Sequence, residues 1–226
     1  ADSNVTFNIP TKKVSAWADQ SDAGSDVAES TSSMQPLRYG YDGPSDKSQI
    51  ALDGTEDNMD SDSEAPFSSG ELSFFFVSRL EVDNANNQHL FSMNRADTTV
   101  FTVSYKLTTI TATATGSANQ VVSSATVPGG GVTEWNICYC QLKKNSATNF
   151  SVIMSINGGA ESTLSGTFQN TDYSTAPFQI GCTQAGGANT DFFGGYISEI
   201  IGYDKAINSD EKTRVLTYLN NKYKIY

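Results

Sequence analysis

The chain has 226 residues, and its 14 Lys and Arg stand against 25 Asp and Glu, a formal net charge of −11. Nucleic-acid backbones are bound by clustered positive charge, so this balance predicts no nucleic-acid partner. No apolar run approaches the roughly 20 residues that a membrane-spanning helix needs, so membrane insertion is not expected either. Only 17% of the residues are charged, while Thr, Ser, Asn and Gly are abundant, which favours strands and turns over a helical bundle.

The acidic residues are concentrated in the first third of the chain. Residues 1–72 hold 14 of the 25 acidic residues and 4 of the 14 basic ones. Long polar stretches there, such as 19–33 and 56–69, alternate with short apolar runs, a pattern typical of loops that connect strands. We therefore expect one domain over residues 1–226, with long acidic loops in 1–72.

From residue 71 onward, segments rich in β-branched and aromatic residues recur at regular spacing. They are residues 71–81, 88–93, 99–107, 120–127, 132–142, 150–156, 161–164, 178–182 and 193–203. Three glycines follow Pro128, and Asn157-Gly158 separates two of the segments, so both places are typical of hairpin turns. Because no helical pattern interleaves these strands, the sequence predicts an all-β sandwich of two antiparallel sheets.

One helix is predicted at the C-terminus. Asn208 is a favourable N-cap, and Glu211 three residues later completes a capping-box pattern. The apolar residues that follow recur at helical spacing and form one face that can pack on the sandwich: Val215, Leu216, Leu219 and Tyr223.

The three cysteines, Cys138, Cys140 and Cys182, are too few and odd in number for a disulfide framework. Cys138 and Cys140 lie two apart in a strand-like segment, so they share one face. Buried thiols that act as small apolar side chains are favoured over a metal pair, since no CxxC spacing or His partner accompanies them. Free thiols fit synthesis in a reducing compartment.

Three segments and the closing helix together resemble the laminin-G-like branch of the concanavalin A-like lectin/glucanase superfamily. They are VSAWADQS at residues 14–21, IALDGTEDNM at 50–59, GYISEIIGYD at 195–204 and the helix after Asn208. The resemblance implies a jelly roll of two antiparallel sheets, with Trp17 in the core and Asp53 and Gly54 in a structural turn. The same fold carries lectins, glycosidases, adhesion modules and virion proteins, so the function has to come from the site.

A glycosidase needs two carboxylates that flank the scissile bond. Catalytic members of the superfamily carry an E-x-D-x-x-E or E-x-D-x-E strand, and the nearest match here, EVDNAN at residues 81–86, lacks the last carboxylate. Glu81 and Asp83 are better explained as solvated charges at a strand end. His89, the one histidine, has no nucleophile motif around it. The sequence therefore predicts no catalytic residues.

Calcium is the one cofactor that the sequence leaves open. Asp57, Asp60 and Asp62 form an acidic run that continues to Glu64, and Ca²⁺ takes roughly 6–8 oxygen ligands of this kind. The spacing differs from that of an EF-hand loop and lacks its central glycine. A solvated acidic loop is the favoured alternative, and no other cofactor is expected.

A glycan site combines an aromatic platform with Asn, Asp or Gln side chains for the sugar hydroxyls. Asp83, Asn86 and Asn87 lie in an Asn-rich loop and are the polar candidates, and Tyr105 is the aromatic candidate. Further tyrosines expected to be exposed are Tyr39, Tyr41 and Tyr173. Both tryptophans are expected in the core because their neighbours are apolar. The alternative for the Asn-rich loop is an ordinary turn.

The main hypothesis is a non-catalytic, surface-displayed module of a virion, either a phage head decoration or a fibre domain. Free thiols and the absence of a leader-like segment in the printed sequence favour it. Its partners would be copies of itself, capsid proteins or cell-surface glycans, and it would lie on the virion surface or outside the cell. The alternative is a secreted or cell-surface carbohydrate-binding domain. A polysaccharide hydrolase that uses Glu81 or Asp83 is the third hypothesis.

Overall fold

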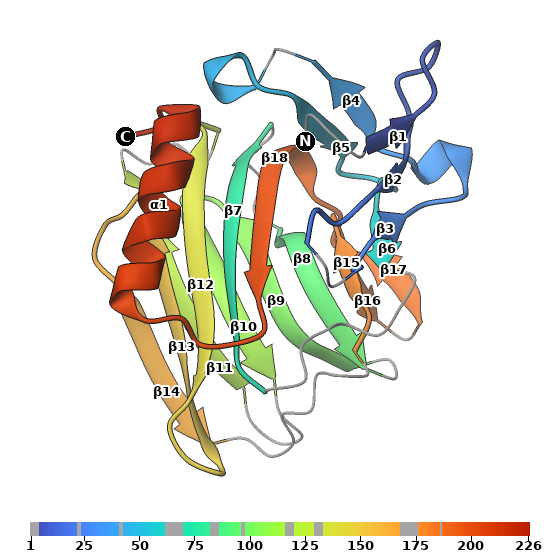
Figure 1. Ribbon diagram of the computed structural model, residues 1–226. Helices are drawn as coiled ribbons and strands as arrows, with labels where there is room; N and C mark the ends of the chain where they lie inside the picture. The colour runs from blue at the N-terminus through green and yellow to red at the C-terminus, as the bar shows by residue number, and fades with distance from the viewer. Residues whose placement is uncertain are drawn as a thin grey trace.

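The computed structural model shows two antiparallel β-sheets and one C-terminal helix, as the sequence predicts (Figure 1). The structure describes residues 5–21, 24–40, 43–61, 70–81, 86–95, 98–115, 120–128, 133–167, 176–185 and 187–226, with the backbone alone at 95, 98 and 99. In this part of the chain, no helix has the length and apolar character that would let it cross a bilayer.

The two large sheets have nine and seven strands. The nine-stranded sheet has the order β1 (Val5–Phe7), β2 (Val14–Trp17), β3 (Val27–Ala28), β6 (Met59–Ser61), β15 (Phe178–Ile180), β8 (Gln88–Arg95), β9 (Thr98–Lys106), β10 (Thr109–Thr115) and β11 (Gln120–Thr126). The seven-stranded sheet has the order β14 (Ser162–Thr167), β13 (Asn149–Ile156), β12 (Asn136–Lys144), β7 (Leu72–Leu80), β18 (Gly194–Tyr203), β5 (Gln49–Asp53) and β4 (Leu37–Tyr39).

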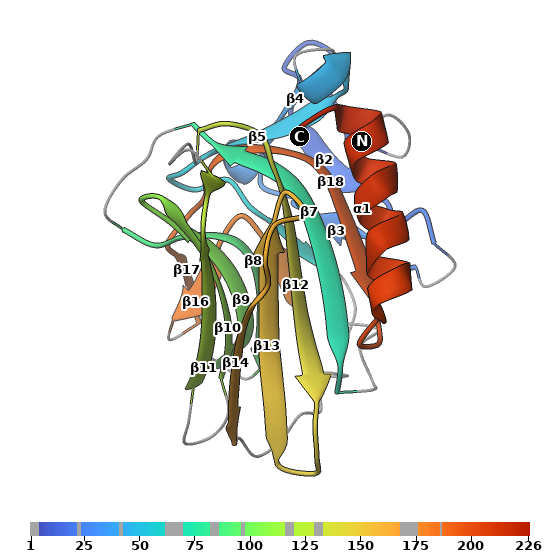
Figure 2. The same cartoon turned by 90° about the vertical axis from the view of Figure 1, so that its left-hand side faces the viewer.

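The remaining elements are short, apart from the helix. They are the hairpin β16 (Thr183–Ala185) and β17 (Ala188–Thr190), the 3₁₀ turns η1 (Ser32–Met34) and η2 (Pro44–Asp46), and the helix α1 (Ser209–Tyr223). The hairpin packs on β8 and β9. The helix lies on the face of the seven-stranded sheet that is turned away from the other sheet (Figure 2).

The main core fills the space between the two sheets. Along each strand, alternate side chains point inward, which gives the period-two pattern of a half-buried sheet. Aromatic rings meet at its centre, where the ring centres of Phe74 and Phe91 are 4.6 Å apart and those of Phe74 and Phe76 are 5.7 Å apart. Cys138 and Cys140 belong to this core, and Cys182 is also buried, so the prediction of buried free thiols is confirmed.

A second core lies between α1 and the seven-stranded sheet. Phe75 and Val77 of β7 point toward the helix, while their neighbours point into the main core. All four residues of the predicted apolar face of the helix join this core: Leu216, Leu219 and Tyr223 are buried, and Val215 packs against them partly buried. Because the middle of β7 is buried on both faces, its four central residues, FFFV at 74–77, form an unbroken apolar run instead of an alternating pattern.

The turn after β5 is held by the carboxylate of Asp53. Its Oδ1 accepts hydrogen bonds from the backbone N–H groups of Thr55, Glu56 and Asp57 at 2.8, 3.0 and 3.1 Å. Gly54 has a φ of +75°, and a Cβ there would lie 3.0 Å from the Gly194 Cα, so both the backbone conformation and the space require glycine.

The two carboxyl groups of this turn have pKa values shifted in opposite directions. Burial raises the pKa of Asp57 to about 7, and the nearby charge of Asp53 adds to the effect. Partial burial also raises the pKa of Asp53, but hydrogen bonds from Thr55 and from three backbone N–H groups outweigh it and lower the pKa to about 2. The turn therefore holds one carboxylate and, below neutral pH, one protonated acid.

The capping box of α1 supplies a first stability prediction. The Asn208 Oδ1 accepts hydrogen bonds from the backbone N–H groups of Asp210 and Glu211, each at 3.0 Å, and the Glu211 carboxylate accepts one from the Asn208 N–H. Asn208→Ala removes the cap, and we expect it to lower the free energy of unfolding by about 1 kcal/mol and the thermal midpoint by about 2–4 °C. Asn221→Ala, at an exposed position of the same helix, is the control and should leave the midpoint within a degree or raise it. Equal midpoints for the Asn208 variant and the wild type would contradict the role of the cap.

Asp57 supplies a second prediction, on the pH dependence of stability. Between about pH 4 and 7 the folded state keeps a proton on Asp57 that the unfolded chain has lost, so this residue makes stability fall as pH rises, by at most about 1.4 kcal/mol per pH unit. Asp57→Asn removes this slope and still offers an oxygen to the Asp53 N–H, which now donates to Asp57 at 3.1 Å. Burial lowers the pKa of His89 and gives a slope of opposite sign, but that slope is common to both proteins and cancels in their difference. Urea unfolding at pH 4.5, 6 and 7.5 should show that the free energy of unfolding of the variant increases relative to that of the wild type as pH rises. A difference in unfolding free energy that is the same at all three pH values would refute the raised pKa of Asp57.

Candidate functional site

Of the residues proposed from the sequence for glycan binding, those that the structure describes do not form a common site. Asp83 lies outside the described residues, and Asn86 and Asn87 are exposed just before β8. The expectation that Tyr105 is exposed is wrong: its ring is completely buried, and its hydroxyl lies 2.8 Å from the Ser78 Oγ. Tyr105 points inward because it shares a face of β9 with the core residues of that strand.

The proposed calcium ligands have other partners. Asp57 accepts a hydrogen bond inside its own turn, and the Asp60 carboxylate accepts one from Gln179 Nε2 at 2.8 Å. Asp62 and the neighbouring Glu64 lie outside the described residues. Among the residues that the structure describes, no three His, Cys, Asp or Glu side chains are grouped so that they could hold a metal ion.

The outer face of the nine-stranded sheet is polar but already occupied by its own side chains. Asn94 Nδ2 donates to Gln179 Oε1 at 2.7 Å, and Gln179 Nε2 also donates to Asn189 of the β16–β17 hairpin at 3.1 Å. Ser92 Oγ donates to the Cys182 carbonyl at 2.9 Å. Asn94, Gln179 and Ser92 are all at least 97% buried, so this network fixes the hairpin on the sheet and leaves them little surface for a ligand.

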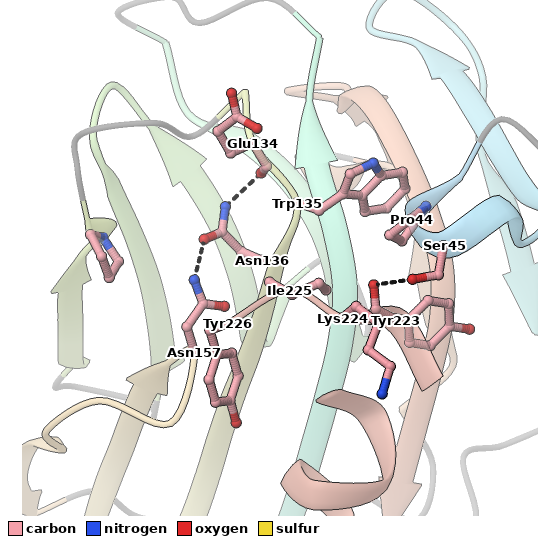
Figure 3. Close-up of a pocket in the computed structure, with 11 residues that line it drawn as sticks. Pro44, Ser45, Glu134, Trp135, Asn136, Asn157, Tyr223, Lys224, Ile225 and Tyr226 are labelled. Atoms are coloured by element: carbon pink, nitrogen blue, oxygen red, sulfur yellow. Dashed lines mark hydrogen bonds between the residues drawn. The ribbon is translucent and has the colours of Figure 1, made fainter. Parts of the chain in front are cut away.

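A pocket of about 660 Å³ lies on the other side of the molecule, where the end of α1 meets the outer face of the seven-stranded sheet (Figure 3). Segments that are far apart in the sequence line it. They are Pro44 and Ser45 of η2, Pro128, Glu134 to Asn136 at the start of β12, Asn157 in the turn after β13, and Tyr223 to Tyr226. Its volume falls in the usual range for small-ligand sites.

Side-chain amides fix one wall of the pocket. Asn157 Nδ2 donates to Asn136 Oδ1 at 2.9 Å, and Asn136 Nδ2 donates to the Glu134 carbonyl at 2.7 Å (Figure 3). Asn157 Oδ1 accepts from the Ile137 N–H at 2.8 Å. Asn157 and Gly158 both have positive φ, as the predicted tight hairpin turn requires. The hairpin thereby holds the start of β12 in place.

The C-terminal residues form the opposite wall. Asn220 Oδ1 accepts hydrogen bonds from the backbone N–H groups of Ile225 and Tyr226, both at 3.0 Å. The Tyr226 ring lies against Gly158, where a Cβ would come within 2.9 Å of its hydroxyl oxygen. Ser45 Oγ donates to the Tyr223 carbonyl at 2.8 Å and joins the η2 turn to the end of the helix. Hydrogen bonds and ring contacts to η2, Gly158 and Asn220 therefore hold this wall of the pocket in place.

Trp135 belongs to the pocket and also to a row of side chains that continues across the sheet. We call the row Trp135, Arg79, Tyr196 and Tyr39 the aromatic–arginine strip. The Arg79 guanidinium carbon lies 5.5 Å from the centre of the Trp135 ring and 4.5 Å from that of Tyr196. The rings of Tyr196 and Tyr39 meet edge to face at 6.2 Å. All four side chains are half-buried.

Strand register explains why the strip lies on the outer face of the sheet. Arg79 of β7 is paired with Tyr196 of β18, and the next residues on both strands, Leu80 and Ile197, point into the main core. The Tyr196 hydroxyl is hydrogen-bonded to the exposed Glu81 carboxylate. Partial burial and this carboxylate together raise the pKa of Tyr196, so its hydroxyl stays protonated.

The pocket and the strip have the chemistry of a binding surface. An aromatic ring can cover the apolar face of a pyranose, and the amides, hydroxyls and charges around it can bond to the sugar hydroxyls. Among the described residues that line the pocket, Glu134 is the one carboxylate, whereas the usual glycosidase mechanisms need two. The Glu81 of the expected pair is exposed, and Asp83 lies outside the described residues.

Sequence reasoning missed this surface because it assigned both tryptophans to the core. Trp135 does pack against the second core, but it is half-buried and forms a wall of the pocket. Trp17 is also half-buried and packs against the main core. The available signal was the position of Trp135 at the start of a strand, between a glycine-rich turn and a buried amide at Asn136.

Structures of known proteins resemble this one over most of the chain. The binding domain of Paraclostridial Mosquitocidal Protein 1 has a TM-score of 0.61 at 16% identity, with 96% of this chain and 52% of that chain covered. The binding domain of Botulinum Neurotoxin DC, solved in complex with SialylT, has a TM-score of 0.59 at 11% identity, covering 96% and 51%. The chain therefore spans about half the length of these two domains, and at such identities the likeness establishes the fold.

A shorter structure also matches. The CBM40 domain of the Ruminococcus gnavus IT-sialidase, bound to α2,3 sialyllactose, has a TM-score of 0.50 at 15% identity, with 65% of this chain and 82% of that chain covered. These three similar structures are binding domains by their descriptions. No curated protein sequence matches the chain.

The sequence itself gives the family. Residues 53–211 match a laminin-G profile described as the concanavalin A-like lectin/glucanases superfamily. The match covers more than half of the chain, from the Asp53-Gly54 turn to the first residues of α1, and it includes all of β7 and Trp135. The chain belongs to the concanavalin A-like lectin/glucanases superfamily.

Proposed function

We propose that this chain is a non-catalytic carbohydrate-binding domain of a secreted or cell-surface protein, and that it binds glycans at the pocket and along the aromatic–arginine strip. The observation that carries the proposal is Trp135, a half-buried indole on the wall of a 660 Å³ pocket. Among the described residues, no acceptor is bonded to its indole N–H, so the ring offers both a flat apolar face and a donor.

The polar groups around Trp135 suit a sugar. Asn157 and Asn136 keep their orientation by bonding to each other and to the backbone, so they lose little freedom when a ligand arrives. Ser45, Glu134 and Lys224 are exposed at the rim and can exchange water for sugar hydroxyls. A rigid aromatic and amide wall with an adaptable polar rim favours reversible binding.

The similar structures support this proposal over the virion hypothesis. The botulinum neurotoxin domain and the CBM40 domain were solved with sialylated ligands. Nothing in the comparisons supports a decoration or fibre role, or capsid partners, so we replace the virion hypothesis with its alternative. We also propose that residues 1–226 form one domain and that it acts outside the cell.

Binding without hydrolysis follows from the residues at the surface. The superfamily includes glucanases, but a glycosidase places two carboxylates at most about 9.5 Å apart across its substrate. In the described part of the site, Glu134 stands alone in the pocket, and Glu81 is bonded to Tyr196 on the strip. We therefore expect bound glycans to be released intact.

Replacing the indole is the direct test of the proposed function. Trp135→Ala should weaken the glycan hits of a wild-type array screen by at least about tenfold, because it removes the stacking surface and the donor. Tyr218→Ala is the matched control, since Tyr218 is an exposed aromatic residue of α1 that does not line the pocket. EDTA should leave binding unchanged, because the proposed contacts are rings and amides.

The array screen decides between outcomes once folding is checked by circular dichroism and thermal melting. Loss of binding in the Trp135 variant with retention in the Tyr218 variant supports the proposal. An absence of glycan hits for the folded wild type, or full binding by the Trp135 variant, would overturn it. Release of reducing sugar from a bound polysaccharide would show that the chain is an enzyme.

A further inference from the structure

Among the residues that the structure describes, Arg79 is a cation with no ion-pair partner, in a chain that is strongly acidic. The chain carries 25 Asp and Glu, yet the three ion pairs among the described residues, Lys205–Glu211, Lys212–Glu161 and Lys222–Glu199, do not include it. Its guanidinium also has no hydrogen-bond acceptor among the described residues, and its Nε is buried. In the described part of the chain, no carboxylate pairs with the Arg79 guanidinium and no acceptor takes its N–H donors.

The two rings beside Arg79 hold the guanidinium in position. Trp135 and Tyr196 lie 5.5 and 4.5 Å from it, and cation–π contacts of this kind hold the charge near the rings without using the N–H donors. Burial of Nε reduces the contact of the guanidinium with water, which strengthens its attraction for an anion. The position is fixed, and the terminal nitrogens do not belong to the buried unpaired atoms.

We infer that the strip recognises the carboxylate of an acidic saccharide, with Arg79 as the anchoring cation. This inference rests on the proposed function and narrows it to one class of glycan. A planar guanidinium can donate two parallel hydrogen bonds to a carboxylate, a geometry that neutral hydroxyls do not match. Trp135 borders both the pocket and Arg79, so a sugar ring on the indole carries its substituents toward the guanidinium.

Glu81 sets the strength of this site. It lies two residues from Arg79 on the same face of the chain, and the Tyr196 hydroxyl bonds to it, but it does not come within ion-pair distance of Arg79. The negative charge of Glu81 repels an incoming carboxylate, although salt in the solvent partly screens this repulsion. Removing that charge should strengthen the binding of acidic glycans and leave neutral glycans unaffected.

The first experiment compares glycans on the unaltered protein, so it does not depend on the folding of a variant. The probes are 3′-sialyllactose, its carboxyl-reduced form, lactose and an oligogalacturonate, measured by isothermal titration at 50 and 500 mM NaCl. Sialic and uronic acids share the carboxylate but differ in the rest of the ring, so the two acidic probes distinguish the two sources of that group. We expect an acidic probe to bind at least tenfold more tightly than its neutral counterpart and to lose affinity at high salt.

The second experiment locates the effect at Arg79. Arg79→Gln should reduce the affinity for the acidic probe at least tenfold, Arg79→Lys should recover part of it, and Glu81→Gln should raise it. Arg38→Gln is the matched control, because Arg38 also stacks on a ring, that of Phe7, and bonds to Ser48, but it does not belong to the strip. Each variant is melted first, since Arg79 also supports two aromatic rings.

The outcomes separate this inference from the proposed function. Equal affinity for the acidic and the carboxyl-reduced probes would show that Arg79 only supports the rings, and so would unchanged binding of the acidic probe by a folded Arg79→Gln variant. If neutral glycans still bind in a manner that depends on Trp135, the proposed function stands without this inference. A preference for sulfated glycans over both carboxylated probes would also overturn the inference. If the folded protein binds no glycan on the array, the proposed function itself is wrong.

Discussion

The burial of β7 on both faces is the constraint on which the rest of the structure depends. Phe74 and Phe76 fill the space between the sheets, and Phe75 and Val77 form the floor on which α1 packs. One strand therefore joins the sandwich core to the helix core, and the helix position follows from it. Because the C-terminal residues continue from that helix, the apolar packing of α1 on β7 helps to position this wall of the pocket, together with its hydrogen bonds.

The same strand supplies the charged centre of the proposed site. Beyond the part that the helix covers, β7 presents Arg79 on its outer face, between Trp135 from the start of β12 and Tyr196 from β18. The outer face of the seven-stranded sheet is thus divided into an apolar part under α1 and an aromatic, cationic part beside it. On the outer face of the other sheet, the described side chains of Asn94 and Gln179 bond to each other and are buried, so these two groups offer little surface to a ligand.

Local patterns predicted much of the fold. The capping box at Asn208, the Asn157-Gly158 hairpin and the apolar run of β7 depend on near neighbours, and the structure contains all three. The strand β10 was missed because its alternation of Thr with Ala is weakly apolar, although Ile110 and two alanines do point into the core. Tyr105 was predicted to be exposed because it carries a hydroxyl group, although it follows Phe101 and Val103 on the inward-facing side of β9 and is buried. The site could not be predicted in this way, because it combines strands paired in space with a turn and a tail, and the Arg79–Tyr196 register appears only when β7 and β18 are aligned.

Nuclear magnetic resonance of the indole N–H groups tests the central claim most directly, because the chain has two tryptophans that lie in different places. Trp135 borders the pocket, and Trp17 packs against the main core and serves as an internal reference. On titration with a glycan that the protein binds, the account predicts that the Trp135 indole signal shifts in a saturable manner, together with the Asn157 side-chain amide, while the Trp17 signal stays in place. A saturable shift of Trp17 with no change at Trp135, or shifts confined to the outer face of the nine-stranded sheet, would contradict it.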